Sequence, residues 1–247
     1  MIRAIAVLLV LLLTVTALAQ DYNVPFRPRA AAGGGGGNLL SETFTGAGYS
    51  DADWTESGTG TIDEDETGSC GSGTGWTTDC LELALTTGQT GKTTNAFAAQ
   101  TGDVWVRFRA KINWATANSS EYVTIAGLNV AGAGDTTGGI TVEITQFGGP
   151  VYELSLRTGS LSSGSTELDF LTAPASGETH CYEIYMNDAT NAWQWWIDGA
   201  DQGSGTDSGI AVDPTNLWIS PRTPTGTSIT IYADDVQVSN VARQTCT

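Results

Sequence analysis

Apolar and polar residues alternate along much of the chain, which is the pattern of strands with one buried face. In DVWVRFRAKINW (residues 103–114), every second side chain from Val104 to Ile112 is apolar, and most of those between are polar. The alternation recurs in GITVEITQF, YELSLRTG and CYEIYMN. The side chains expected to face the core are Val104, Val106, Phe108, Ala110, Ile112, Ile140, Val142, Ile144, Tyr152, Leu154, Leu156, Tyr182, Ile184 and Met186.

Gly, Asn, Asp and Pro residues interrupt these segments, so the sequence predicts many short strands joined by turns. Further strands are expected at 121–130, 216–220 and 227–238, with shorter ones near 42–45 and 81–85. No sustained helical period follows the N-terminal segment, and no internal repeat is evident. Strands with one polar face pack as two sheets about 10 Å apart. We therefore expect an all-β fold, an antiparallel two-sheet β-sandwich of the jelly-roll kind.

One predicted strand, NAWQWWIDG (residues 191–199), carries three tryptophans in four positions. Alternation places Trp193, Trp195 and Ile197 on the core face. It places Gln194, Trp196 and Asp198 on the polar face. Asp198-Gly199 predicts a turn, after which DQGSG returns as the second strand of a hairpin. Trp193 and Trp195 are expected to fill the core. Trp196 is expected to be an exposed indole on the polar face, with no packing role there.

The N-terminal segment predicts secretion. Arg3 precedes an apolar run that ends before Ala17-Leu18-Ala19, which fits a signal peptidase site. Residues 1–19 are therefore expected to be a signal peptide cleaved near Ala19, with a retained anchor as the alternative, and no later stretch is apolar enough for membrane insertion. Residues 20–37 are rich in Pro and Gly and predict a flexible tether. Residues 38–247 then form one domain.

Charge and cysteines narrow the class of protein further. The formal net charge is −17, which repels nucleic acid and anionic lipid, so we expect neither as a partner. Four cysteines (Cys70, Cys80, Cys181 and Cys246) in a secreted chain favour two disulfides over metal ligands. The preferred pairing is Cys70–Cys80, closing a Gly/Ser/Thr-rich loop, with Cys181–Cys246 tying the C-terminal tail to a strand. The sequence itself leaves three connectivities open.

Three short segments resemble the concanavalin A-like lectin/glucanase superfamily, particularly its laminin G-like jelly-roll domains. They are SETFTGAGYSDADW, which contains Glu42, the hairpin WWIDG, and the closing strand ITIYADDVQVSN, which contains Asp234 and Asp235. The resemblance covers about residues 40–240 and implies that the first and last strands are neighbours. Glu42 would then lie near Asp234 and Asp235, and these carboxylates could bind a structural Ca²⁺ of the kind often found in that family. The acidic run 63–66 is expected to be a solvated loop, with calcium as the alternative.

One segment suggests catalysis. ELDFLT resembles the E-x-D-x-x-E strand of retaining β-glucanases, with Glu167 and Asp169 at the first two acidic positions. Thr172 replaces the third, so the proton donor is missing and hydrolysis is not expected. A lyase remains an alternative because Arg107, Arg109 and Lys111 lie on a polar face, but we favour cross-strand pairing with acidic residues, which explains them without any ligand. We assign no catalytic residue, and enzyme activity stays open.

Binding is the function that this sequence favours. We expect a secreted, non-catalytic carbohydrate-binding or adhesion module with a glycan or polysaccharide as its partner. Trp196 would be the stacking platform, unless a loop or a subunit contact buries it. Its expected polar partners, if their strands adjoin, are Gln194, Tyr185, Glu183, Arg157 and Glu143. The alternatives are a structural subunit of an extracellular fibre, surface layer or virion, for which an oligomer is possible, and a polysaccharide-degrading glycoside hydrolase or lyase.

Overall fold

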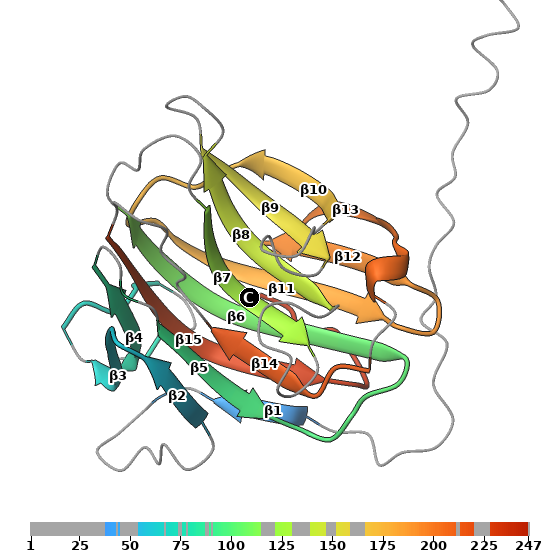
Figure 1. Ribbon diagram of the computed structural model, residues 1–247, viewed down its shortest axis with the longest axis horizontal. Coiled ribbons are helices and arrows are strands. Elements are labelled where there is room, and N and C mark those ends of the chain that lie inside the picture. Colours follow the sequence, from blue (N-terminus) through green and yellow to red (C-terminus); the bar gives the residue numbers. More distant parts are fainter. Residues whose placement is uncertain are drawn as a thin grey trace, which may run out of the picture. The chain divides into compact units, whose positions relative to one another are not determined.

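A computed structural model gives the fold (Figure 1). It describes residues 38–42, 44, 54–66, 68–73, 76–77, 79–86, 89, 91–114, 122–129, 139–146, 152–158, 166–210, 213–219 and 228–246. The expected signal peptide and tether lie outside these residues. Within the described ranges, the search for a helix with the length and apolar character needed to cross a membrane finds none.

Two antiparallel sheets form a sandwich, which confirms the expected fold class. The first sheet has the strand order β13-β12-β11-β6-β15-β4-β3, with β1 also paired to β15. Its strands are β1 (Asn38–Glu42), β3 (Thr61–Glu66), β4 (Cys80–Leu85), β6 (Asp103–Trp114), β11 (Thr179–Asn187), β12 (Ala192–Ile197), β13 (Ala200–Thr206) and β15 (Ile229–Ser239). The termini of the described domain therefore meet in one sheet.

The second sheet has the strand order β10-β9-β8-β7-β14-β5-β2. Its strands are β2 (Trp54–Gly58), β5 (Gly91–Ala96), β7 (Tyr122–Asn129), β8 (Ile140–Gln146), β9 (Tyr152–Thr158), β10 (Thr166–Thr172) and β14 (Asn216–Ile219). A 3-10 turn, Ser208–Ile210, follows β13. In Figure 1, β7 and β8 are drawn across β11 and β6, and residues of both sheets pack into one core, so the two sheets lie face to face.

The core lies between the sheets. The alternating residues of β6, β8 and β11 belong to one buried apolar cluster, as do Leu154 and Leu156 of β9 and Trp193, Trp195 and Ile197 of β12. Tyr152 of β9 is partly buried and packs against this cluster. These inward-facing assignments are confirmed. The opposite side of the first sheet carries a second, smaller cluster of Trp105, Tyr185, Ala192 and Trp196.

The hydrophobic pattern does not predict three of the strands. Strands β2, β3 and β5 were not expected, and β1 lies a few residues before the expected strand at 42–45. The acidic run 63–66 is part of β3, which pairs with β4, so its prediction as a loop is wrong. Backbone hydrogen bonds to a neighbouring strand hold such polar segments, and the side-chain pattern does not reveal them.

Both preferred disulfides are present. Cys70 is bonded to Cys80 across 10 positions, and Cys181 is bonded to Cys246 across 65 positions. Two disulfides indicate an oxidising compartment, because reducing compartments keep thiols free. Each bond fastens a non-strand segment to the first sheet, and these segments border the candidate site.

Candidate functional site

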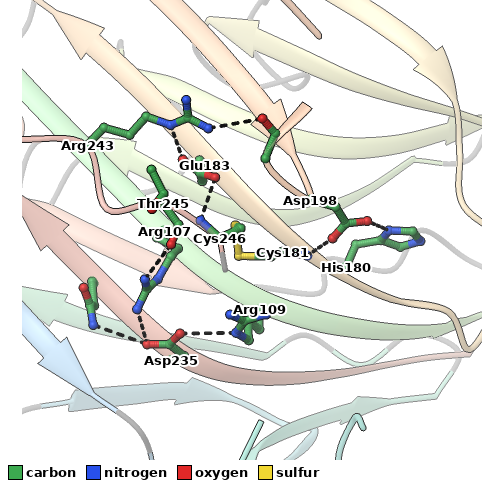
Figure 2. Close-up of a disulfide and its surroundings, with 12 residues drawn as sticks. Arg107, Arg109, His180, Cys181, Glu183, Asp198, Asp235, Arg243, Thr245 and Cys246 are labelled. Atoms are coloured by element: carbon green, nitrogen blue, oxygen red, sulfur yellow. Dashed lines mark hydrogen bonds and ion pairs between the residues drawn. A yellow bond between two sulfur atoms is a disulfide. The ribbon is translucent and has the colours of Figure 1, made fainter. Parts of the chain in front are cut away.

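The outer face of the first sheet has a basic row on β6. Arg107, Arg109 and Lys111 lie on the side of β6 opposite its core residues. Asp235 of β15 accepts hydrogen bonds from Arg107 and, at 3.2 Å, from Nε of Arg109 (Figure 2). A bulge between Asp234 and Gln237 gives Asp235 a φ of 49°, and bulges of this kind redirect side chains. The bulge therefore places one carboxylate between two guanidinium groups.

A loop closed by the Cys70–Cys80 disulfide docks at one end of this row. Lys111 Nζ donates to the carbonyl oxygen of Ser69 at 2.7 Å. The backbone N–H and the hydroxyl of Thr77 donate to the Asp234 carboxylate at 2.7 and 3.0 Å. A Cβ on Gly71 would lie 2.4 Å from Cε2 of Trp76, so the indole packs directly against the glycine backbone. Residue 71 must be glycine for this approach.

The C-terminal segment Asn240–Cys246, here called the strap, docks at the other end. Cys246 is bonded to Cys181, and its N–H donates to Oε1 of Glu183 at 2.9 Å. Arg243 donates from Nε to the other oxygen of Glu183. Arg107 donates to the carbonyl oxygen of Thr245 at 3.0 Å. Figure 2 shows these contacts converging around the disulfide.

A pocket of about 250 Å³ lies between the loop and the strap. The loop contributes Ser72, Gly73 and Trp76, and the strap contributes Cys246. Arg109, His180, Cys181 and Asp198 complete most of the lining. The pocket thus combines an indole and a disulfide with several polar groups, which can fix the orientation of a small ligand.

Asp198 fixes the histidine that lines this pocket. Its Oδ2 lies 2.7 Å from Nδ1 of His180, and its Oδ1 accepts the N–H of Cys181 at 2.8 Å. Asp198 has a φ of 50° at the turn after β12, a left-handed conformation that aspartate tolerates. The other ring nitrogen of His180 is buried and lies 3.5 Å from Glu178 Oε2. The imidazole therefore forms a fixed polar wall.

Trp196 occupies the expected face but is not the expected platform. It lies on the outer side of the sheet, away from Trp193 and Trp195. Only 7% of its surface is exposed, because the guanidinium of Arg243 lies 3.9 Å from its ring centroid. The expectation of an exposed indole at 196 is therefore wrong, and the alternative of a covered ring describes the structure.

Three other predicted partners of Trp196 do lie on the same face. Glu183 is 1% exposed and bonds to the strap as described above. The Tyr185 hydroxyl donates to Asp103 at 2.7 Å, and burial, together with this bond, raises the pKa of Tyr185. Gln194 donates to Asp201 at 2.7 Å. The protein itself thus supplies hydrogen-bond partners for all three side chains.

Arg157 and Glu143 lie elsewhere. They belong to β9 and β8 of the second sheet, so their strands do not adjoin β11 and β12. The structure therefore does not bring all six predicted ligand-binding residues into one site. Arg157 lies between two carboxylates, with Nε 3.8 Å from Glu143 and Nη1 3.0 Å from Glu167. This charge row crosses β8, β9 and β10.

The glucanase-like segment does not form a carboxylate pair. A bulge between Glu167 and Asp169 breaks the alternation of β10. Glu167 pairs with Arg157, whereas Asp169 accepts the indole N–H of Trp195, a core residue, at 2.8 Å. The two carboxylates therefore serve different partners, and the geometry of double displacement is not formed by these residues.

Asp234 and Asp235, two of the three predicted calcium ligands, already bind other groups of the protein. Strand β1 pairs with β15, and Glu42 is opposite Val236, as the resemblance implied. Asp235 is held by two arginines, and Asp234 accepts hydrogen bonds from Thr77 and from the N–H of Asp235. Adjacent guanidinium groups would repel Ca²⁺. Within the described part of the chain, no three His, Cys, Asp or Glu side chains are grouped to hold a metal ion.

Sequence reasoning missed Trp76 as a site residue. It lies in the loop that the disulfide prediction identified, but the face that the loop covers depends on contacts with Asp234 and Lys111 far along the chain. One signal was available. Cys181 precedes a core residue by one position, so a tail bonded to it must cross the outer face beside Glu183 and Tyr185.

Comparison with known proteins identifies the fold. No protein-family model and no curated protein sequence matches this chain. Among solved structures, the cellulose-induced protein Cip1 aligns with a TM-score of 0.60 and 19% identity, over 84% of this chain and 100% of that one. A botulinum neurotoxin type C structure, described for cell entry through two ganglioside molecules, aligns with a TM-score of 0.57 and 11% identity, over 83% of this chain and 48% of that one. The calreticulin globular domain of T. cruzi aligns with a TM-score of 0.55 and 13% identity, over 83% of this chain and 89% of that one.

The chain shares a β-sandwich fold with these three proteins. This chain spans about half the length of the neurotoxin chain that it matches, 48%. At identities of 11–19%, the likeness identifies the fold alone.

Proposed function

We propose that this protein is a secreted, non-catalytic carbohydrate-binding module that binds one sugar residue in the pocket between Trp76 and the Cys181–Cys246 disulfide. The single observation that carries the proposal is the composition of that pocket. An indole beside fixed polar groups suits a sugar, because the C–H groups of the sugar pack on the aromatic surface while its hydroxyls form hydrogen bonds.

The size of the pocket supports a small ligand. Its volume of about 250 Å³ lies just below the range of ~300–1,000 Å³ for pockets that bind drug-sized molecules. One sugar ring at a chain end or branch suits such a space better than an extended polymer. Ser72 offers a hydroxyl and the exposed Asp198 offers a carboxylate for sugar hydroxyls.

The fold and the chain ends add support. The proteins with similar folds include one that interacts with gangliosides, which carry sugars, and one that is induced by cellulose. The two disulfides fit an extracellular location. The N-terminal residues 1–19 match a signal peptide and 20–37 a tether, which would hold the module at a distance from whatever it is attached to.

A glycan array on the oxidised, full-length mature protein tests the proposal, followed by titration with each sugar that binds. Replacing Trp76 with Ala should weaken binding roughly tenfold, the loss of one aromatic contact. Trp114→Ala is the matched control, because Trp114 is a partly buried tryptophan that contacts Tyr152 outside the pocket. No array signal, or equal loss in both variants, would refute the assignment of this pocket.

A further inference from the structure

The strap covers a surface with the composition of a ligand site. Trp196 is opposite Glu183 on the neighbouring strand, and Tyr185 and Trp105 extend the aromatic surface. Arg243 covers this surface: its guanidinium lies over the indole of Trp196, and its Nε donates a hydrogen bond to the carboxylate of Glu183. The strap thus supplies the cation that a buried carboxylate and an aromatic face would otherwise lack.

The same strap is a wall of the pocket. Figure 2 shows the bond between Cys181 and Cys246. Both cysteines border the pocket, so the disulfide itself is part of the lining. Strand β15 ends at Ser239, and the strap beyond it is held by contacts that involve side chains of the sheet. Val241 within it is 54% exposed. The disulfide is therefore the covalent anchor of a lightly packed segment.

Building on the proposed function, we infer that the Cys181–Cys246 disulfide is a redox latch on the pocket. A dithiol reductant attacks the bond through a mixed disulfide, and two electrons and two protons convert the two sulfurs into thiols while the dithiol becomes a disulfide. The strap then leaves the sheet. The pocket loses the wall formed by Cys246, sugar binding falls, and Trp196 becomes exposed.

Accessibility makes this bond a suitable target. Cys246 is partly exposed and lines the pocket, whereas Cys181 is buried, so we expect a thiolate to attack the bond at Cys246. Release of the strap leaves Glu183 without Arg243, but water can then solvate the carboxylate from the uncovered face. Strand β11, which carries Cys181 and Glu183, keeps its backbone pairing with β6 and β12, so the change is confined to the outer face.

The experiment follows strap release and pocket opening without any glycan. Hydrogen–deuterium exchange reports on peptides from the strap, β12 and β6 in untagged protein. Carbethoxylation of His180, the single histidine of the chain, reports on the pocket. Four forms are compared: oxidised wild type, dithiol-treated wild type, Cys181→Ser/Cys246→Ser, and the matched control Cys70→Ser/Cys80→Ser, which retains the strap disulfide.

In the reduced wild type and in Cys181→Ser/Cys246→Ser, strap exchange and His180 modification should each rise about tenfold, while β6 stays protected. In Cys70→Ser/Cys80→Ser, strap protection should remain. A strap that stays protected after reduction overturns the latch, and so does loss of β6 protection, which would mean that the domain unfolds as a whole.

Glycan binding separates this inference from the proposed function. If the oxidised protein binds a sugar on the array, reduction should lower its affinity at least tenfold, and unchanged affinity overturns the latch. If the oxidised protein binds no sugar, the proposed function fails, and the exchange and His180 measurements still decide whether the disulfide controls the strap and the pocket.

Discussion

The guanidinium of Arg243 lies 3.9 Å above the centre of the Trp196 ring. The same side chain donates to Glu183, which is 1% exposed, so one arginine both covers an indole and neutralises a buried carboxylate. These two contacts link the strap to the sheet in addition to the disulfide.

Replacing Arg243 with Ala should lower the free energy of unfolding by about 2 kcal/mol. The estimate combines a cation–π contact with the cost of a buried carboxylate that has lost its cation, reduced because Arg243 is partly exposed. Urea denaturation measures the change. Adding Glu183→Gln should restore part of the loss because the bare charge is gone. Equal stability of Arg243→Ala and wild type would contradict the contact.

The two disulfides should differ in their contribution to stability. Cys181–Cys246 joins residues 65 positions apart, and Cys70–Cys80 joins residues 10 positions apart. Loop-closure entropy then predicts losses of about 4 kcal/mol for Cys181→Ser/Cys246→Ser and about 3 kcal/mol for Cys70→Ser/Cys80→Ser. Guanidinium denaturation of both double variants measures the order, and a reversed order would mean that native contacts outweigh chain entropy here.

Asp169 should matter for folding and not for chemistry. Removing its carboxylate by Asp169→Ala leaves the indole N–H of buried Trp195 without this acceptor, which should cost about 1–2 kcal/mol. Glu167→Ala serves as the comparison, because it removes the neighbouring acidic residue of β10 and leaves the Trp195 bond in place. Thermal unfolding of the two variants is the measurement. Hydrolysis of a β-glucan that disappears in either variant would revive the glucanase hypothesis.

The contribution of Asp234 to the stability of the protein should fall as pH rises, whereas most carboxylates contribute more at higher pH. Burial raises the pKa of this carboxyl above its ordinary value of 3.8, even though Thr77 donates hydrogen bonds to it. Between the unfolded and the higher folded pKa, the folded state binds more protons, so this group's contribution to stability falls as pH rises. The stability of wild type minus that of Asp234→Asn should therefore decrease as pH rises above about 4. Denaturation of both proteins across pH 3–7 measures the difference, and a rising difference would contradict the assigned shift.

The side-chain pattern predicted the core well because burial on one face of a strand is a local property. Every second residue from Val104 to Ile112 and from Tyr182 to Met186 faces the core, as alternation requires, and so do Trp193 and Trp195. Polar edge strands were missed for the same reason. In β3, TIDEDE has almost no apolar face, and its place in the sheet is fixed by backbone pairing with β4.

The candidate site was harder to predict because it depends on contacts between distant parts of the chain. Alternation placed Trp196 on the correct face, but its exposure depends on Arg243. The predicted ligand set joined Glu183 to Arg157, which topology places in different sheets. Strand order is set by crossovers and loops, and no periodicity in the sequence encodes it.

The charge row on the second sheet has a consequence for how the edge strand β10 aligns. Glu143, Arg157 and Glu167 alternate in sign across three adjacent strands. If β10 slipped by one residue, Leu168 would come to lie opposite Arg157, Glu167 would rotate toward the apolar interior, and the arginine would lose its second carboxylate. The ion pair between Glu167 and Arg157 thus helps to specify the alignment of β10, together with the hydrogen bond from Trp195 to Asp169.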